Sequence, residues 1–247
     1  MTGLISIVKK LVSQFLSSIR QVINSSRLDF FVLGESYYLK HLRRFSDYVV
    51  GPIQRDEALF LYALVKMVDP KTIVEFGFYK GASATNFLKA MSSDARLYSY
   101  DISNASMRFA GKIRDSRFRF ILKSLTAFVP SDTDNRPIDL AFFDASHDFD
   151  LNVAAFEKVK GCLNERGLVV VHDTGAHYVD SNRCQTPTGY FLGGQPDAGY
   201  IHQPNERKFV NYIRKSDQNF EQIHLHCTTK FRHGLTVLQR NTSPLPL

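Results

Sequence analysis

Apolar residues recur at steps of three and four through residues 1–24, which is the spacing of one helix face. Lys9, Lys10 and Arg20 fall mostly off that face. The pattern predicts an N-terminal helix that either packs on its own domain or a partner subunit, or lies on a membrane surface. A second helix is predicted over residues 54–68, and it ends at Asp69 because the following proline disfavours helical geometry there.

From residue 71 the pattern changes to short apolar runs that alternate with helical stretches. This alternation indicates an α/β domain with a doubly wound, mostly parallel sheet and helices on both faces. The predicted strands cover residues 72–76, 97–100, 118–122, 138–143 and 167–172, and the clearest helices between them cover 82–91 and 150–163.

The pattern breaks again over residues 175–204, where five glycines and three prolines predict a long connection, which is often functional. A helix is expected to restart near Asn205. Two strands at about 220–227 and 234–240 are close enough to form an antiparallel hairpin at the sheet edge. We therefore divide the chain into an N-terminal helical extension, residues 1–50, and one domain, residues 51–247.

Composition and charge narrow the cellular location and the classes of partner that the sequence predicts. The 247 residues are 44% apolar and 22% charged, which supports a packed core. No apolar run reaches the length of a membrane-spanning helix, no signal-peptide cleavage site follows residues 1–24, and three scattered cysteines predict no disulfide framework. These features predict a cytoplasmic protein. The net charge is +7, but without a zinc-finger or RNA-binding signature or a dense basic block we expect no nucleic-acid partner.

The most informative segment runs from Thr72 to Thr85, where an apolar strand enters a turn with glycines at 77 and 81 and a helix follows. Glycine allows a sharp turn and a close approach of a ligand, and a helix start offers unpaired N–H groups. The next predicted strand ends at Asp101, where a carboxylate can accept both hydroxyls of a ribose. The segment lacks the G-x-G-x-x-G pattern, which weakens a nicotinamide interpretation.

This segment resembles motif I of the class I S-adenosylmethionine-dependent methyltransferases. The resemblance continues through residues 120–125, 138–147 and 167–174, in the family's order, and covers about residues 50–240. It implies a Rossmann-like, seven-stranded sheet and S-adenosylmethionine as the cofactor. Glu75 would contact the amino-acid part of the cofactor, and Asp101 would hold its ribose. The cofactor-binding set implied in this way is Glu75, Gly77, Gly81, Ser83, Asp101, Ile102, Ser124 and Asp144.

Two further carboxylates, Asp144 and Asp173, each follow an apolar strand, so both are expected in the crevice at the carboxyl ends of the strands. Together they could hold a hard cation such as Mg²⁺. His147 lies three residues after Asp144, and its near-neutral pKa suits removal of a proton from an acceptor hydroxyl. Asp144 and His147 are therefore the catalytic candidates.

This arrangement is similar to the metal-assisted O-methyltransferases that act on catechols and macrolide sugars. The resemblance implies metal ligands at Asp144 and Asp173, with Thr174 at the usual position of the next ligand. Two alternatives stay open: Asp144 contacts only the sulfonium end of the cofactor, or His147 only caps the following helix or bonds to backbone. We expect strand alternation to turn His172 away from Asp173.

The sequence thus predicts an O-methyltransferase acting on a hydroxyl of a small molecule, such as a sugar or a glycosylated natural product. Residues 1–24 would serve a homo-oligomer or a membrane surface. The alternatives are a metal-free O- or N-methyltransferase on the same scaffold, and a non-catalytic cofactor-binding protein associated with membranes. Acceptor contacts are sought in the 175–204 connection, at His177, Tyr178, Tyr190 and His202.

Overall fold

The computed structural model describes residues 40–45, 53–174, 203–216, 220–225 and 234–240. The chain divides into two units, residues 1–43 and 44–247. Of the first unit, the described part is most of the short 3-10 helix η1 (Lys40–Arg44). The helix expected over residues 1–24, and the connection expected over 175–204 except its end, lie outside the described residues. The proposed domain boundary at residue 50 stays a prediction.

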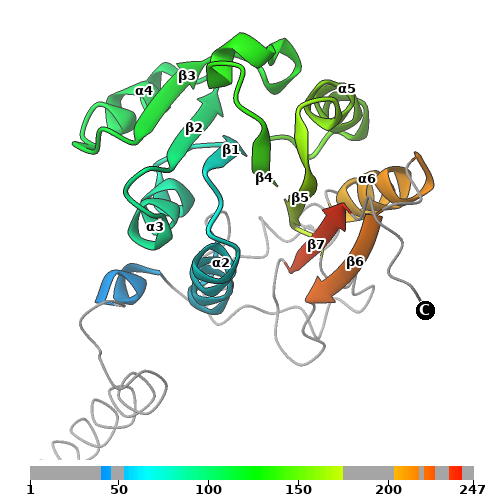
Figure 1. Ribbon diagram of the computed structural model, residues 1–247, viewed down its shortest axis with the longest axis horizontal. Coiled ribbons are helices and arrows are strands. Elements are labelled where there is room, and N and C mark those ends of the chain that lie inside the picture. Colours follow the sequence, from blue (N-terminus) through cyan, green and yellow to red (C-terminus); the bar gives the residue numbers. More distant parts are fainter. Residues whose placement is uncertain (1–39, 46–52, 175–202, 217–219, 226–233, 241–247) are drawn as a thin grey trace, which may run out of the picture. The chain divides into compact units, whose positions relative to one another are not determined.

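The second unit is built on one seven-stranded sheet with the order β3-β2-β1-β4-β5-β7-β6 (Figure 1). Strands β1 to β5 run parallel, whereas β7 pairs antiparallel with β5 and β6 pairs antiparallel with β7. This confirms the mostly parallel sheet with an antiparallel C-terminal strand pair. The strands are β1 (Thr72–Phe76), β2 (Arg96–Asp101), β3 (Phe118–Leu122), β4 (Ile138–Phe143), β5 (Leu163–His172), β6 (Phe220–Leu225) and β7 (Leu235–Arg240).

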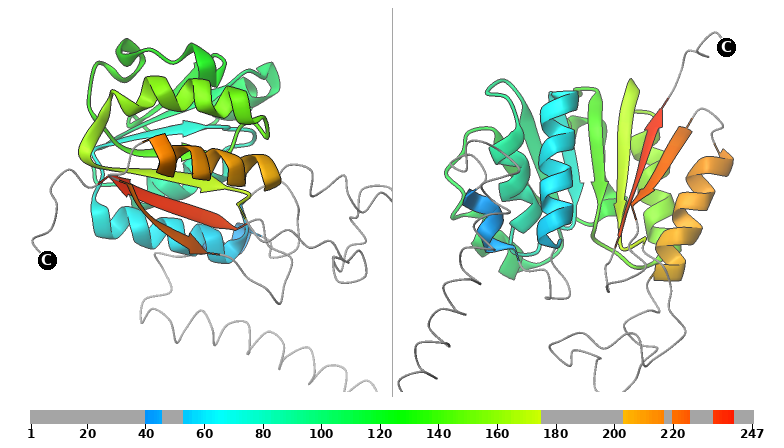
Figure 2. Two further views of the ribbon diagram at one scale, coloured as in Figure 1. Left: turned by 90° about the vertical axis from the view of Figure 1, so that its right-hand side faces the viewer. Right: turned by 90° about the horizontal axis from the view of Figure 1, so that it is seen from below.

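Helices cover both faces of this sheet. In Figures 1 and 2, α2 and α3 lie on one face and α5 and α6 on the other, while α4 packs beside β3. The helices are α2 (Arg55–Val68), α3 (Ala82–Ala90), α4 (Asn104–Ala110), α5 (Phe149–Lys160) and α6 (Gln203–Ser216), with 3-10 turns η2 (Leu125–Ala127) and η3 (Pro130–Thr133) between β3 and β4. No helix among the described residues is both long and apolar enough to cross a membrane.

The central strands are buried on both faces and mostly apolar. Every residue of β1 is buried, because helices shield the strand from both sides. The ring of Phe76 lies 5.1 Å from that of Tyr100 on β2 and 4.9 Å from that of Phe143 on β4, measured between centroids. These aromatic contacts join the three strands whose carboxyl ends carry the candidate site.

Three elements differ from the prediction. Helix α5 ends at Lys160 and β5 begins already at Leu163, with a register shift in its pairing to β4 between Ile138 and Leu140. The helical stretch expected between the strands at 97–100 and 118–122 has no predicted bounds, because the seven residues of α4 show no clear apolar stripe. Its start is fixed locally instead: the hydroxyl of Ser103 accepts a hydrogen bond from the backbone N–H of Ala105.

Candidate active site

The turn after β1 brings the backbone unusually close to the end of β4. Gly77 has φ +104°, and a Cβ atom there would lie 2.1 Å from the carbonyl oxygen of Asp144. Gly81 has φ +77°, and a Cβ atom there would meet the ring of Phe78 at 2.6 Å. Only glycine fits both the left-handed conformation and the space at these two positions. These close contacts explain why the tight turn predicted from the sequence requires glycine at both positions.

Glu75, on β1, is fully buried beneath this turn. Its carboxylate accepts hydrogen bonds from the hydroxyls of Ser83, in the first turn of α3, and Ser99, on β2. Burial raises the pKa of Glu75 to about 7, and the hydroxyl donors only partly oppose this effect. The residue thus links β1, β2 and α3, and it holds a carboxyl group that can change charge near neutral pH.

Asp101 ends β2 and organises the neighbouring turns. Its Oδ2 atom accepts hydrogen bonds from the backbone N–H of Tyr79 at 2.7 Å and from the hydroxyl of Ser106 at 2.9 Å, and Oδ1 accepts from the N–H of Ser103 at 2.8 Å. A carboxylate offers about four acceptor positions, so three bonds leave capacity for a ligand hydroxyl. Asp101 therefore supports the glycine turn and is also able to receive a ligand.

Two more expected cofactor residues lie at the ends of neighbouring strands. Ile102, directly after β2, is 76% exposed although it is large and apolar. Ser124 follows β3, and its hydroxyl caps η2 by accepting from the N–H of Thr126. An exposed aliphatic side chain beside Asp101 is suited to contact a flat apolar group of a ligand.

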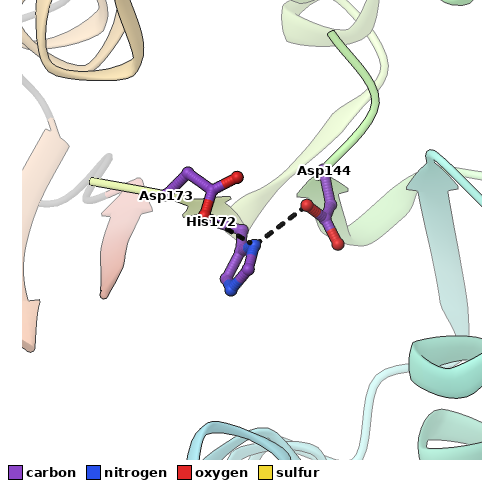
Figure 3. Close-up of side chains that lie close together, drawn as sticks. All are labelled: Asp144, His172 and Asp173. Atoms are coloured by element: carbon purple, nitrogen blue, oxygen red, sulfur yellow. Dashed lines mark hydrogen bonds and ion pairs between the residues drawn. The ribbon is translucent and has the colours of Figure 1, made fainter. Parts of the chain in front are cut away.

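Asp144, His172 and Asp173 converge where β4 and β5 end (Figure 3). The Nδ1 atom of His172 lies 2.9 Å from Oδ1 of Asp144 and 3.4 Å from Oδ1 of Asp173. On the other side of the ring, Nε2 lies 3.1 Å from Oε2 of Glu57, a buried residue of α2. One potential ligand atom from each of the three clustered residues lies within 4.8 Å of the others.

The expectation that His172 turns away from Asp173 is wrong. Asp173 has φ +59°, a left-handed conformation that interrupts strand alternation directly after β5. The side chains at positions 172 and 173 therefore approach each other instead of facing opposite sides. Thr174, by contrast, is buried, and its hydroxyl accepts a hydrogen bond from that of Thr236 at 2.8 Å on β7.

The charges of this cluster are strongly coupled. Burial favours the neutral imidazole, but the carboxylates of Asp173, Asp144 and Glu57 outweigh it and raise the pKa of His172 well above its usual value. Burial likewise raises the pKa of Asp144, while the adjacent His172 opposes that shift. With no cation bound, the cluster therefore favours a buried imidazolium held between carboxylates.

His147 stands beside this cluster with 40% of its side chain exposed. Its Nδ1 atom lies 2.7 Å from Oε1 of Glu206, in the first turn of α6, and 3.7 Å from Oδ2 of Asp173. Burial lowers the pKa of His147, but Glu206 and Asp173 outweigh this and raise it overall. Helix α5 is capped by Asp148, whose Oδ1 accepts from the N–H of Leu151, so capping is not the role of His147.

The structure brings most of the predicted residues to one edge of the sheet. The sequence analysis did not identify Glu57 or Glu206 as site residues. Glu57, on α2, contacts His172, which is 115 residues away in the chain, and Glu206, on α6, contacts His147, which is 59 residues away. No local spacing connects residues so distant in the chain. The acceptor contacts suggested at His177, Tyr178, Tyr190 and His202 lie outside the described residues. The described cluster combines a partly exposed imidazole with two carboxylates, a set able to remove a proton from a bound ligand.

One family model matches the sequence over this region, and solved structures resemble the chain in fold. Residues 74–174 match a family model described as a methyltransferase domain. An O-methyltransferase from Bacillus cereus in complex with SAH is 17% identical with a TM-score of 0.61, covering 87% of this chain and 96% of its own. The O-methyltransferase TomG from Streptomyces achromogenes, in complex with SAM, is 18% identical with a TM-score of 0.56, covering 83% and 88%.

An SAH-bound methyltransferase from Podospora anserina is 17% identical with a TM-score of 0.58, covering 90% of this chain and 96% of its own. At these identities the likeness concerns the fold. Among curated proteins, none matches the sequence. The sequence match, by contrast, begins within β1 and ends just after β5. It includes the glycine turn, Asp101 and the residues from Asp144 to Asp173, but not Glu57 or Glu206.

Proposed function

We infer that this chain, which carries a methyltransferase domain of the class I fold, uses S-adenosylmethionine to methylate a hydroxyl group of a small molecule. The observation that carries the inference is the convergence of His147 with Asp144 and Asp173 at the carboxyl ends of β4 and β5, next to the glycine turn and Asp101. Ligands of doubly wound sheets bind at this edge, where the strand order reverses.

The cofactor assignment rests on three features of the turn and its neighbours. Gly77 and Gly81 permit a close approach of the ligand, and Asp101 keeps acceptor capacity for a ribose hydroxyl. Exposed Ile102 offers an apolar contact for the adenine ring. Glu75 lies too deep to be a simple surface contact, so it would act on the amino-acid end of the cofactor through Ser83 or through water.

The reaction would be a direct displacement at the methyl carbon. The acceptor oxygen forms a bond to the methyl group, the sulfur–methyl bond breaks, and its electron pair neutralises the positive sulfur. The acceptor proton passes to the neutral imidazole of His147. Because the methyl group is already activated, the protein contributes mainly alignment and deprotonation.

A divalent cation fits the cluster at the end of β5. Asp144 and Asp173 supply carboxylate oxygens, and His172 supplies Nδ1 once its proton is released, with Glu57 accepting from Nε2 as an orienting partner. A bound cation would lower the pKa of the acceptor hydroxyl and fix its direction. The imidazole in the set favours a first-row transition metal such as Mn²⁺ over Mg²⁺, which prefers oxygen ligands alone.

A metal-free reaction is the second candidate. It is favoured by the hydrogen bonds that His172 already makes to Asp144 and Glu57, since this pairing compensates both carboxylates without a cation. Under this alternative, Asp144 would face the sulfonium end of the cofactor, and His147 would keep its role as base.

Calorimetry tests the cofactor assignment, and a chelator tests the metal. We expect micromolar binding of S-adenosylmethionine by the wild type and no binding of NAD. Methyl transfer should be assayed with a panel of candidate acceptors that includes catechols, sugars and glycosides. Each assay is run with EDTA and with added Mn²⁺ or Mg²⁺. Turnover that survives EDTA would support the metal-free candidate, whereas absence of cofactor binding would overturn the proposed function.

A further inference from the structure

The contact between His147 and Glu206 joins two elements that are far apart in the chain. Glu206 is 3% exposed, and its Oε1 atom lies 2.7 Å from Nδ1 of the imidazole. Its second oxygen, Oε2, is buried and has no hydrogen-bond partner among the described residues. A buried carboxylate that is only half satisfied destabilises the fold, so it calls for a functional explanation.

The backbone around His147 is fixed independently of this contact. The side-chain amide of Asn205 donates to the carbonyl oxygen of His147 at 2.8 Å, and that of Asn152 donates to the carbonyl of Ser146 at 2.7 Å. Because the main chain is already held, the carboxylate of Glu206 is not needed to place the loop. Its remaining effect is on the orientation and proton distribution of the imidazole ring.

The position of the carboxylates selects one form of that ring. Glu206 lies on the Nδ1 side at 2.7 Å, within hydrogen-bond distance, whereas Asp173 lies on the same side at 3.7 Å, beyond that distance. A carboxylate accepts but cannot donate, so it stabilises the tautomer with hydrogen on Nδ1. The opposite nitrogen, Nε2, then carries the lone pair that a general base requires.

We propose that Glu206 is a positioning residue that holds His147 in the Nδ1–H tautomer and leaves Nε2 to accept the proton of the acceptor hydroxyl. This rests on the proposed function, in which His147 is the base. Glu206 itself does not touch the reacting atoms.

The test measures the tautomer of His147 and the turnover rate in the wild type and in Glu206 variants. In ¹⁵N-histidine-labelled protein saturated with S-adenosylhomocysteine, the nitrogen shifts of His147, assigned by comparison with His147→Gln, should show hydrogen on Nδ1 in the wild type. In Glu206→Ala the ring should shift to the Nε2–H tautomer. We expect kcat to fall about 10²–10⁴-fold while KM and cofactor affinity change little. Lys208→Ala, exposed on the same helix, is the control and should match the wild type.

Glu206→Gln keeps the size of the side chain and serves if the alanine variant does not fold. Its amide can accept from or donate to Nδ1, so kcat should follow whichever tautomer is measured. An Nε2–H tautomer in the active wild type, or full turnover in a variant with that tautomer, would overturn the proposal. Wild-type turnover in His147→Gln would instead overturn the base assignment on which it rests.

Discussion

Replacing Glu75 with glutamine should stabilise the domain at alkaline pH. The carboxyl group is fully buried, and its pKa is raised by burial from 4.5 to about 7. Each pKa unit corresponds to about 1.4 kcal/mol, so ionising Glu75 in the folded domain costs about 3 kcal/mol more than in the unfolded chain. Glutamine avoids this cost, and both serine hydroxyls can still bond to it because a hydroxyl donates or accepts.

The direction in which stability changes with pH follows from the raised pKa of Glu75. A raised pKa in the folded state means that the contribution of Glu75 to stability is fully present below its unfolded pKa of 4.5 and is lost as pH rises through about 7. Urea unfolding of wild type and Glu75→Gln, without ligand, should therefore show a stability difference that grows by about 3 kcal/mol between about pH 4 and pH 9.

An exposed matched substitution provides the control. Glu165→Gln should change the stability by less than about 0.5 kcal/mol throughout, because Glu165 is exposed on the surface. Subtracting the two pH profiles of wild type and Glu75→Gln cancels the titration of all other groups. A difference that stays flat across the pH range would refute the assignment of a buried, titrating carboxyl group beneath the glycine turn.

Three other results are expected. Asp101→Ala should weaken S-adenosylmethionine binding about ten- to a hundredfold by calorimetry, because it removes the acceptor proposed for the ribose; an unchanged affinity would exclude that role. Gly77→Ala should destabilise the domain by at least about 2 kcal/mol in urea unfolding, given φ +104° and a Cβ 2.1 Å from the Asp144 carbonyl oxygen, whereas Gly161→Ala, with its nearest atom at 4.0 Å, should be tolerated. The methyl-transfer rate should fall as pH drops, since only the neutral imidazole of His147 accepts a proton, and the midpoint should lie above 6.5 because the pKa of this histidine is raised; a midpoint below 6.5 would contradict the contacts described for the ring.

The strands of the sheet could be predicted because each one depends on a pattern of neighbouring residues in the sequence. Each central strand is a short apolar run, and the glycines at 77 and 81 mark a turn whose φ values only glycine adopts readily. The bounds of the seven-residue helix α4 could not be predicted, because a capping serine, and not a periodic apolar face, defines its start. Residues at or just after strand ends, such as Asp101 and Asp144, could be placed at the carboxyl ends of the parallel strands by topology alone.

The polar contacts within the site could not be predicted in the same way. His172 was expected on the wrong side because the left-handed backbone at Asp173 has no sequence signature in a non-glycine residue. Glu57 and Glu206 carry no motif, and their partners lie 115 and 59 residues away. Such contacts depend on how helices pack across the sheet, which spacing along the chain does not encode.

Transfer of a labelled methyl group from S-adenosylmethionine to a panel of hydroxyl compounds, compared between wild type and His147→Gln, tests the central claim most directly. We predict that the wild type labels an oxygen of at least one small acceptor. The variant should bind the cofactor with the same affinity in calorimetry but transfer label about 10²–10⁴-fold more slowly. Equal transfer by both proteins would contradict the role of His147, and a wild type that binds the cofactor but labels no hydroxyl of the panel would contradict O-methylation itself.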